Sequence, residues 1–208
     1  MTEGAPLVEF IEVMRRLRAE CPWKAQQTHR SLARYLLEES HETLEAIDLA
    51  DPEHLREELG DLLLQIYFHA AIASEAGHFT IDDVATGLTD KMVRRNPHVF
   101  APGSVAGSEL SPAEVDEQWQ RAKAIEKQRS SVTDGLPPGL PALLYAEKVL
   151  DRLDRAGRAA APARPASRPE DLGQRLLDLV REARSQGVDP EQALRDAVRR
   201  EIDAATEG

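Results

Sequence analysis

The stretch ELGDLLLQIYFHAAI, residues 58–72, decides the fold of this chain. It lies within a helix that we predict from about Pro52 to about Ala76, where Gly77 ends it. From Leu62 onward the helix is apolar on nearly every side, which is typical of a buried helix. Glu58 and Asp61 stand three residues apart at the start of the stretch and therefore share one helix face.

Outside this stretch, proline and glycine divide the chain into further helices, and no segment alternates like a strand of useful length. The sequence therefore predicts an all-α protein. Residues 97–110 are expected to form a loop, and residues 156–169, rich in Ala, Pro and Arg, a linker. Besides the helix around residues 58–72, the expected helices span about 6–20, 31–49, 80–96, 112–130, 170–186 and 190–205.

The composition excludes several classes of protein. The length of 208 residues suits one domain or slightly more, and the net charge of −11 argues against duplex nucleic acid as a partner. The single cysteine, Cys21, excludes a disulfide framework. The longest apolar run, residues 62–72, is about half of a membrane span, and no signal peptide is visible. We therefore expect a cytoplasmic protein with no membrane partner.

Acidic residues form the most informative pattern. Glu38, Glu39 and Glu42 make an EExxE motif on the helix over 31–49, within an arc of ~100°, and leucines with Ile47 occupy the opposite arc. Acids at helical spacing are usually a solvated face. Glu58 and Asp61, however, continue into a row of residues on the helix that we predict to be buried.

Buried carboxylates need partners, because burying each one unpaired costs several kcal/mol. Between residues 35 and 76 the sequence has one arginine, Arg56, and no lysine. A hard divalent cation with oxygen ligands is therefore the better solution, and Mg²⁺ is the usual one where carboxylates meet phosphates.

Basic residues with helical spacing lie farther along the chain. Lys91, Arg94 and Arg95 stand at i, i+3 and i+4, and alone would be a solvated basic face. Beside a carboxylate–metal site they make a phosphate clamp plausible. Trp119 and Lys123 are four residues apart, so the ring and the ammonium group point the same way.

Two tryptophans are ambiguous from the sequence. Trp23, in the predicted loop after the first helix, and Trp119 are each more often core or interface residues than platforms for a nucleobase. The residues alone leave both alternatives open.

Several of these motifs together resemble the MazG family of nucleoside triphosphate pyrophosphohydrolases, over residues from about 7 to 128. The matching segments are CPW at 21–23, QT at 27–28, Tyr35, LEE at 37–39, Glu42, ELGDLL at 58–63 and RRNPHVF at 94–100. The resemblance implies a four-helix-bundle-type core that assembles as a homodimer or higher oligomer. It implies Mg²⁺-dependent hydrolysis, with Mn²⁺ as a substitute, of (deoxy)nucleoside triphosphates to monophosphate and pyrophosphate.

The resemblance also implies a role for each motif residue. In the implied mechanism, metal-activated water attacks the α phosphorus, and the enzyme clears unwanted nucleotides from the pool. The implied metal ligands are Glu39, Glu42, Glu58 and Asp61, with Glu38 as a further ligand or a base that orients the water. The implied substrate contacts are Lys91, Arg94 and Arg95 to the triphosphate, Trp119 and Lys123 to base and phosphate, and Trp23.

The chain departs from the family pattern in places. Lys24 stands where an aspartate usually follows CPW, and Asn96 replaces a histidine. Long members of the family have a second acidic site. Here residues 131–208 look like a linker and a degenerate C-terminal helical segment, since no EExxE precedes Leu172-Gly173-Gln174. We therefore place the MazG-like domain at residues 1–130 and expect its acids to form the only site.

Two alternatives remain open at this stage. The chain could be a relative with narrow specificity, acting on dUTP, dCTP or phosphoribosyl-ATP. It could also be a helical interaction protein without enzymatic activity, whose acids are structural. A panel of nucleotide substrates separates these alternatives.

Overall fold

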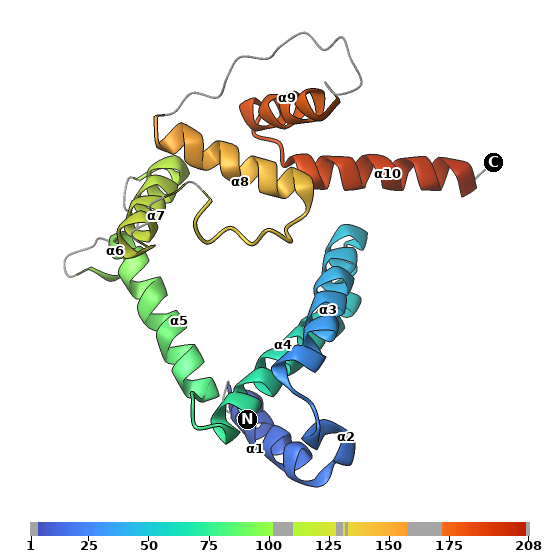
Figure 1. Cartoon of the computed structure of the whole chain (residues 1–208), viewed down its shortest axis with the longest axis vertical. Helices are drawn as coiled ribbons and strands as arrows, with labels where there is room; N and C mark the ends of the chain where they lie inside the picture. Colours follow the sequence, from blue (N-terminus) through green and yellow to red (C-terminus); the bar gives the residue numbers. More distant parts are fainter. Residues whose placement is uncertain (1–3, 102–109, 128–130, 132, 158–171, 207–208) are drawn as a thin grey trace. The chain divides into compact units, whose positions relative to one another are not determined.

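The computed structural model describes residues 4–101, 110–127, 131, 133–157 and 172–206, and every regular element among them is an α-helix, which confirms the all-α prediction (Figure 1). The chain divides into two compact units, Met1–Ala122 and Lys123–Gly208. The helices are α1 (Ala5–Glu20), α2 (Pro22–Ala25), α3 (His29–Leu49), α4 (Pro52–Glu75), α5 (Ile81–Arg95), α6 (Pro97–Phe100), α7 (Pro112–Lys127), α8 (Ala142–Arg155), α9 (Leu172–Ser185) and α10 (Pro190–Thr206).

A helical hairpin of α3 and α4 is the centre of the first unit. The two helices are joined by only Ala50 and Asp51, and so short a connection makes them antiparallel neighbours. The Asp51 carboxylate accepts hydrogen bonds from the backbone N–H groups of Glu53 and His54, at 3.0 and 3.2 Å. Pro52 occupies the first position of α4, where no N–H group is needed. The turn therefore fixes where α4 begins relative to α3.

The N-termini of α3 and α5 are closed by capping boxes. The Thr28 hydroxyl accepts a hydrogen bond from the Ser31 N–H at 3.1 Å, and the Ser31 hydroxyl accepts one from the Thr28 N–H at 2.9 Å. At α5, Thr80 and Asp83 make the same reciprocal pair, as the sequence predicted. These caps explain why the observed helix starts agree with the predicted ones to within about two residues.

The hydrophobic core of the first unit lies where α1 packs on the hairpin. Met14, Leu32, Tyr67 and Phe68 are its buried side chains, from α1, α3 and α4. The Tyr67 hydroxyl also donates a hydrogen bond to the Leu7 carbonyl oxygen at 2.9 Å, which ties α4 to the first turns of α1. Of the four helices of the expected bundle, α4 contacts the other three, α1, α3 and α5.

The prediction that α4 is buried on nearly every side is wrong for the chain by itself. Leu59 and Ile66 of α4 are 51% and 45% exposed, and Leu37 of α3 is 62% exposed. On α3 the residues that pack inward are Leu32, Thr43 and Ala46, with Glu39 among them, rather than the whole leucine arc. An apolar pattern shows which faces avoid water, but one chain supplies too few neighbours to cover all of them.

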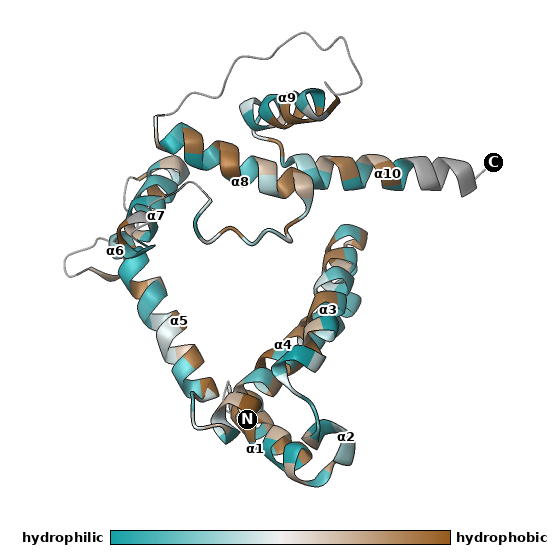
Figure 2. Cartoon of the chain, viewed as in Figure 1, coloured by the Kyte–Doolittle hydropathy of each residue, from teal (hydrophilic) through white to brown (hydrophobic). Residues whose placement is uncertain are grey.

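The second unit is formed by α8, α9 and α10, which contact one another. Hydrophobic and hydrophilic residues alternate in stripes along α8 and α9 (Figure 2). Leu150 and Val180 are buried between them, and Arg184 of α9 pairs with Glu147 and Asp154 of α8 at 2.8 and 2.9 Å. The sequence predicted α9 and α10 but missed α8.

Two regions that were predicted to be loops contain short helices. Single-turn helices, α2 and α6, occur where loops were expected, and each begins at a proline that suits the first helical position. The units divide inside α7, between residues 122 and 123, whereas the domain boundary predicted at 130 stays a prediction. Most of the predicted linker, residues 158–169, lies outside the described residues. No helix in the described part of the chain is long and apolar enough to cross a membrane.

Ala50, which ends α3, has a left-handed backbone with φ of 53°. A non-glycine residue pays about 1 kcal/mol or more for this conformation, because its Cβ crowds the backbone. We expect Ala50→Gly to raise the free energy of unfolding by about 1 kcal/mol, measured by urea denaturation. Ala33→Gly, at an exposed position inside α3, should lower it by about 1 kcal/mol. A loss of stability in both variants would contradict this account of the turn.

Candidate metal centre between α3 and α4

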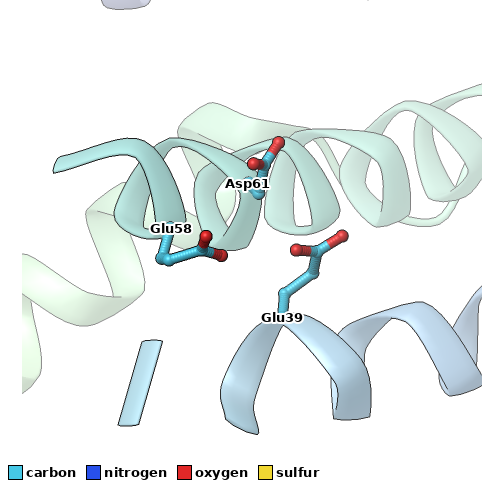
Figure 3. Close-up of side chains that lie close together, drawn as sticks. All are labelled: Glu39, Glu58 and Asp61. Carbon is cyan, nitrogen blue, oxygen red and sulfur yellow. The ribbon is translucent and has the colours of Figure 1, made fainter. Parts of the chain in front are cut away.

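Three carboxylates converge between the two helices of the hairpin. Glu39 extends from α3 toward Glu58 and Asp61 of α4 (Figure 3). One oxygen from each of the three lies within 4.8 Å of the others. The hairpin explains the convergence, since Glu39 lies eleven residues before Ala50 and Asp61 ten residues after Asp51. We call Glu39, Glu58 and Asp61 the acidic cluster.

The acidic cluster is electrostatically unfavourable in the protein alone. Burial raises the pKa of Glu39 above the usual range for a glutamate, and the charges of Asp61, Glu42 and Glu58 raise it further. A carboxylate surrounded by like charges holds its proton more tightly. The arrangement therefore favours any species that brings positive charge among these oxygens.

Two acceptor oxygens on this side of α4 have no hydrogen-bond partner among the described residues. Glu58 is 8% exposed, and its Oε1 lies 3.1 Å from His54 Nε2, whereas its Oε2 is buried and unpartnered. Gln65, one turn beyond Asp61, is 4% exposed and its Oε1 is also unpartnered. Buried acceptors without donors are rare and need a bound cation or water. The oxygen donors of the acidic cluster fit a hard divalent cation.

The other two predicted acids of α3 lie beside the cluster rather than in it. Glu42 is exposed but close enough to Glu39 to hydrogen-bond with it and raise its pKa. Glu38 is exposed and does not belong to the group whose ligand atoms converge. The structure thus brings together three of the four predicted metal ligands and places the fourth next to them.

The predicted cations and Trp119 lie on α5 and α7. Lys91, Arg94 and Arg95 occupy the last two turns of α5. Arg95 is 7% exposed, and its guanidinium lies 5.2 Å from the centre of the Trp119 ring. Lys123 follows Trp119 by one turn of α7. The structure therefore joins Arg95 to Trp119, a contact that the spacing within each helix did not reveal, while the roles of these residues toward substrate stay predictions.

Trp23 is half exposed on α2 and lines an open pocket with residues from the start of α3. Its ring meets the Tyr35 ring edge-on, with centres 6.1 Å apart. The sequence left Trp23 between a core or interface role and a role as a platform for a nucleobase. The structure places it at the surface.

His54 and Gln65 are residues of this site that the sequence reasoning missed. His54 stands four residues before Glu58, a spacing at which side chains of one helix meet, so the sequence did contain that signal. Gln65 continues the row of Glu58 and Asp61, but its lack of a partner is visible only in the structure. Glu58, the buried acid of the cluster, thus has a histidine as neighbour in a segment where lysine and arginine are scarce.

Comparison with known proteins identifies the family to which the chain belongs. The MazG nucleotide pyrophosphohydrolase domain matches residues 27–100, which contain the acidic cluster and all of α5. A nucleoside triphosphate pyrophosphohydrolase/pyrophosphatase MazG of Thermotoga maritima is 37% identical over 222 residues, covering 96% of this chain and 84% of that protein. The chain belongs to the MazG family of nucleoside triphosphate pyrophosphohydrolases, which are hydrolases.

Two further relatives show how the chain compares in length. An uncharacterised 26.1 kDa protein of Streptomyces cacaoi is 46% identical over 210 residues, which are 99% of this chain and 84% of that protein. A nucleoside triphosphate pyrophosphohydrolase of Mycobacterium tuberculosis is 48% identical over 159 residues, which are 76% of this chain and 47% of that protein. The match therefore spans about half the length of the mycobacterial relative.

The raised pKa of Glu39 has a consequence for stability. Since folding makes this carboxyl harder to ionise, the metal-free protein should lose stability as the pH rises above the ordinary glutamate pKa of about 4.3. We expect Glu39→Gln to raise the melting temperature of the EDTA-treated protein at pH 7 by a few degrees, and to change it little at pH 4.

The matched control is Glu45→Gln, which removes an exposed carboxylate of α3 outside the cluster. It should leave the difference between pH 4 and pH 7 as in the original protein. Glu39→Gln that destabilises at pH 7 would show that the cluster is not under electrostatic strain.

Proposed function

We propose that this protein hydrolyses (deoxy)nucleoside triphosphates to the monophosphate and pyrophosphate in a Mg²⁺-dependent reaction, with Mn²⁺ as a substitute. The acidic cluster inside the segment that matches the MazG domain is the observation that carries the proposal. The relatives named nucleoside triphosphate pyrophosphohydrolase support it. Removal of unwanted nucleotides from a cytoplasmic pool is the role that fits this reaction.

The metal would be held by the acidic cluster, with Glu42 in reach of the same site. A divalent cation bound there supplies positive charge to the phosphates and lowers the pKa of a coordinated water. Glu58 Oε2 is the oxygen best prepared for it, since His54 already contacts Oε1 and Oε2 has no partner among the described residues. Without the metal, the negative charge of the cluster would repel the phosphates.

Other side chains would transfer the proton and bind the phosphates. Glu38 is exposed one residue before Glu39, so it can accept a proton from the attacking water while its neighbour holds the metal. Lys91, Arg94 and Arg95 would neutralise the departing pyrophosphate. Trp119 and Lys123 add a ring and an ammonium group one turn apart on α7. In-line attack at the α phosphorus requires all of these charges to be arranged along one triphosphate.

A homodimer or higher homo-oligomer is part of the proposal. Leu37 and Leu44 are exposed seven residues apart on α3, and Leu59 and Ile66 are exposed with the same spacing on α4. Apolar rows with a seven-residue spacing are typical of helices that pack against other helices. A second copy of the chain would bury these rows next to the acidic cluster.

The activity is tested by pyrophosphate release from the eight common NTPs and dNTPs with Mg²⁺. We expect Asp61→Asn to lower kcat by at least 100-fold, because it removes a charge from the cluster that binds the cation, a loss of the size seen when an electrostatic group of an active site is removed. Glu57→Gln removes the exposed carboxylate next to Glu58 and should keep nearly full activity. Substantial Mg²⁺-dependent activity in Asp61→Asn would contradict the assignment. Absence of pyrophosphate release from every nucleotide would instead favour a helical interaction protein.

The assembly is tested by light scattering after size-exclusion chromatography. We expect the original chain to elute as a dimer or larger, and Leu37→Glu/Leu44→Glu to shift it toward the monomer, because charges would be buried in the interface. Leu172→Glu, at an exposed position of α9, is the matched control and should leave the mass unchanged. A monomeric original chain would contradict this part of the proposal.

A further inference from the structure

Glu58, the most deeply buried acid of the cluster, is held by a histidine of its own helix. His54 Nε2 lies 3.1 Å from Glu58 Oε1, and the two residues are four positions apart on α4, a spacing at which side chains of one helix meet. An ionised carboxylate has no hydrogen to donate, so the imidazole is the donor in this contact. The contact leaves Glu58 Oε2, which is buried and has no hydrogen-bond partner among the described residues, as the oxygen open to a cation.

The backbone of His54 is fixed separately, by the turn that begins α4. The Asp51 carboxylate accepts a hydrogen bond from the His54 N–H at 3.2 Å and one from the Glu53 N–H at 3.0 Å. This cap uses only the main chain of His54, so a change of the His54 side chain leaves the cap intact. The effect of such a change can therefore be attributed to the contact with Glu58 rather than to the start of the helix.

The contact with His54 restricts how Glu58 can bind a cation. A glutamate carboxylate can offer one oxygen or both to the same ion, and Ca²⁺ accepts either arrangement. Mg²⁺ requires a nearly ideal octahedron, and the two oxygens of one carboxylate lie too close together to fill two of its positions well. A carboxylate with one oxygen engaged by a hydrogen-bond donor therefore suits Mg²⁺ or Mn²⁺ better than it suits Ca²⁺.

We propose that His54 is a positioning residue, which confines Glu58 to a single ligand oxygen, Oε2, and so favours Mg²⁺ and Mn²⁺ over Ca²⁺ at the acidic cluster. The inference rests on the proposed function and deepens it by naming a residue that prepares the metal site. His54 acts through Glu58 and contacts neither the cation nor the nucleotide.

A histidine suits this role better than a lysine or an arginine. An imidazole can donate a hydrogen bond while it is uncharged, whereas lysine and arginine donate as cations. A permanent positive charge next to Glu58 would compete with the metal ion for the negative charge of the cluster. Partners that hydrogen-bond to metal ligands in this way typically change metal affinity by about 10- to 100-fold when they are removed.

The test titrates the full chain with Mn²⁺ at pH 7.5, without nucleotide, and follows free Mn²⁺ by electron paramagnetic resonance. His54→Phe keeps a ring of similar size but removes the donor, and should raise the Kd for Mn²⁺ by about 10- to 100-fold. His54→Gln removes the ring but carries an amide N–H group at about the reach of Nε2, and should keep a Kd close to the original. His78→Phe, at an exposed histidine beyond the end of α4, is the matched control and should leave the Kd unchanged.

The selectivity is measured by displacing the bound Mn²⁺ with Ca²⁺. We expect His54→Phe to weaken Ca²⁺ binding less than Mn²⁺ binding, because the freed carboxylate can offer both oxygens to the larger ion. The preference for Mn²⁺ should be kept in His54→Gln. Equal losses for the two ions in His54→Phe would overturn the confinement of Glu58 to one oxygen.

A purely structural role of His54 would give a different result. His54→Phe would then lower the melting temperature of the EDTA-treated protein and leave the Kd for Mn²⁺ at its original value, which would overturn the proposal. A normal Kd in His54→Phe together with a raised Kd in His54→Gln would also overturn it, because the ring rather than the donor would then matter. His54→Leu, a second variant without a donor, should behave as His54→Phe does.

This inference and the proposed function can fail separately, because the binding test needs no turnover. If the original chain hydrolyses nucleotides but every His54 variant binds Mn²⁺ equally well, the role of His54 fails and the proposed function stands. If no nucleotide is hydrolysed but the donor-free variants bind Mn²⁺ weakly, the proposed function fails and the role of His54 at a cation site stands. An original chain that binds no Mn²⁺ would overturn the role of His54.

Discussion

The main constraint on the first unit is one unfavourable arrangement, the placement of Glu39, Glu58 and Asp61 together in the interface between α3 and α4. Packing of Met14, Leu32 and Phe68 and the capped turn at Ala50–Asp51 hold the helices against one another although these charges repel. Burial of apolar side chains contributes enough free energy to tolerate a few kcal/mol of local repulsion. The same repulsion would favour a bound cation at the cluster, because the free energy of repulsion would be released when the cation binds.

The charges of the first unit are segregated in a way that suits an anionic substrate in an acidic protein. With a net charge of −11, the chain would repel a triphosphate at long range. The acids are concentrated in the middle of the hairpin, whereas guanidinium groups stand before them at Arg30 and Arg34 and on α5 at Arg94 and Arg95. In the proposed function, these guanidinium groups and a metal ion at the acids would supply the positive charge that binds the nucleotide.

Much of this could be predicted from the sequence, because it depends on short-range rules. Proline, glycine and capping pairs such as Thr80 and Asp83 locate helix ends, and a two-residue turn determines that Glu39 opposes Asp61. The contact of His54 with Glu58 and the unpartnered oxygen of Gln65 depend on side-chain packing. The exposure of Leu37 and Ile66 depends on which neighbours one chain provides, and the pocket beside Trp23 depends on the single turn of α2. The spacing of apolar and polar residues in the sequence does not reveal these contacts, this exposure or this pocket.

The central claim, that the hairpin acids form a divalent cation site, is tested most directly by titrating the protein with Mn²⁺ at pH 7.5 and following free Mn²⁺ by electron paramagnetic resonance. The account predicts that Mn²⁺ binding saturates at no more than a few ions per chain and that Mg²⁺ displaces the bound Mn²⁺. It predicts that the binding is lost in Asp61→Asn and retained in Glu57→Gln. Equal binding by both variants, or binding that does not saturate in the original chain, would contradict it.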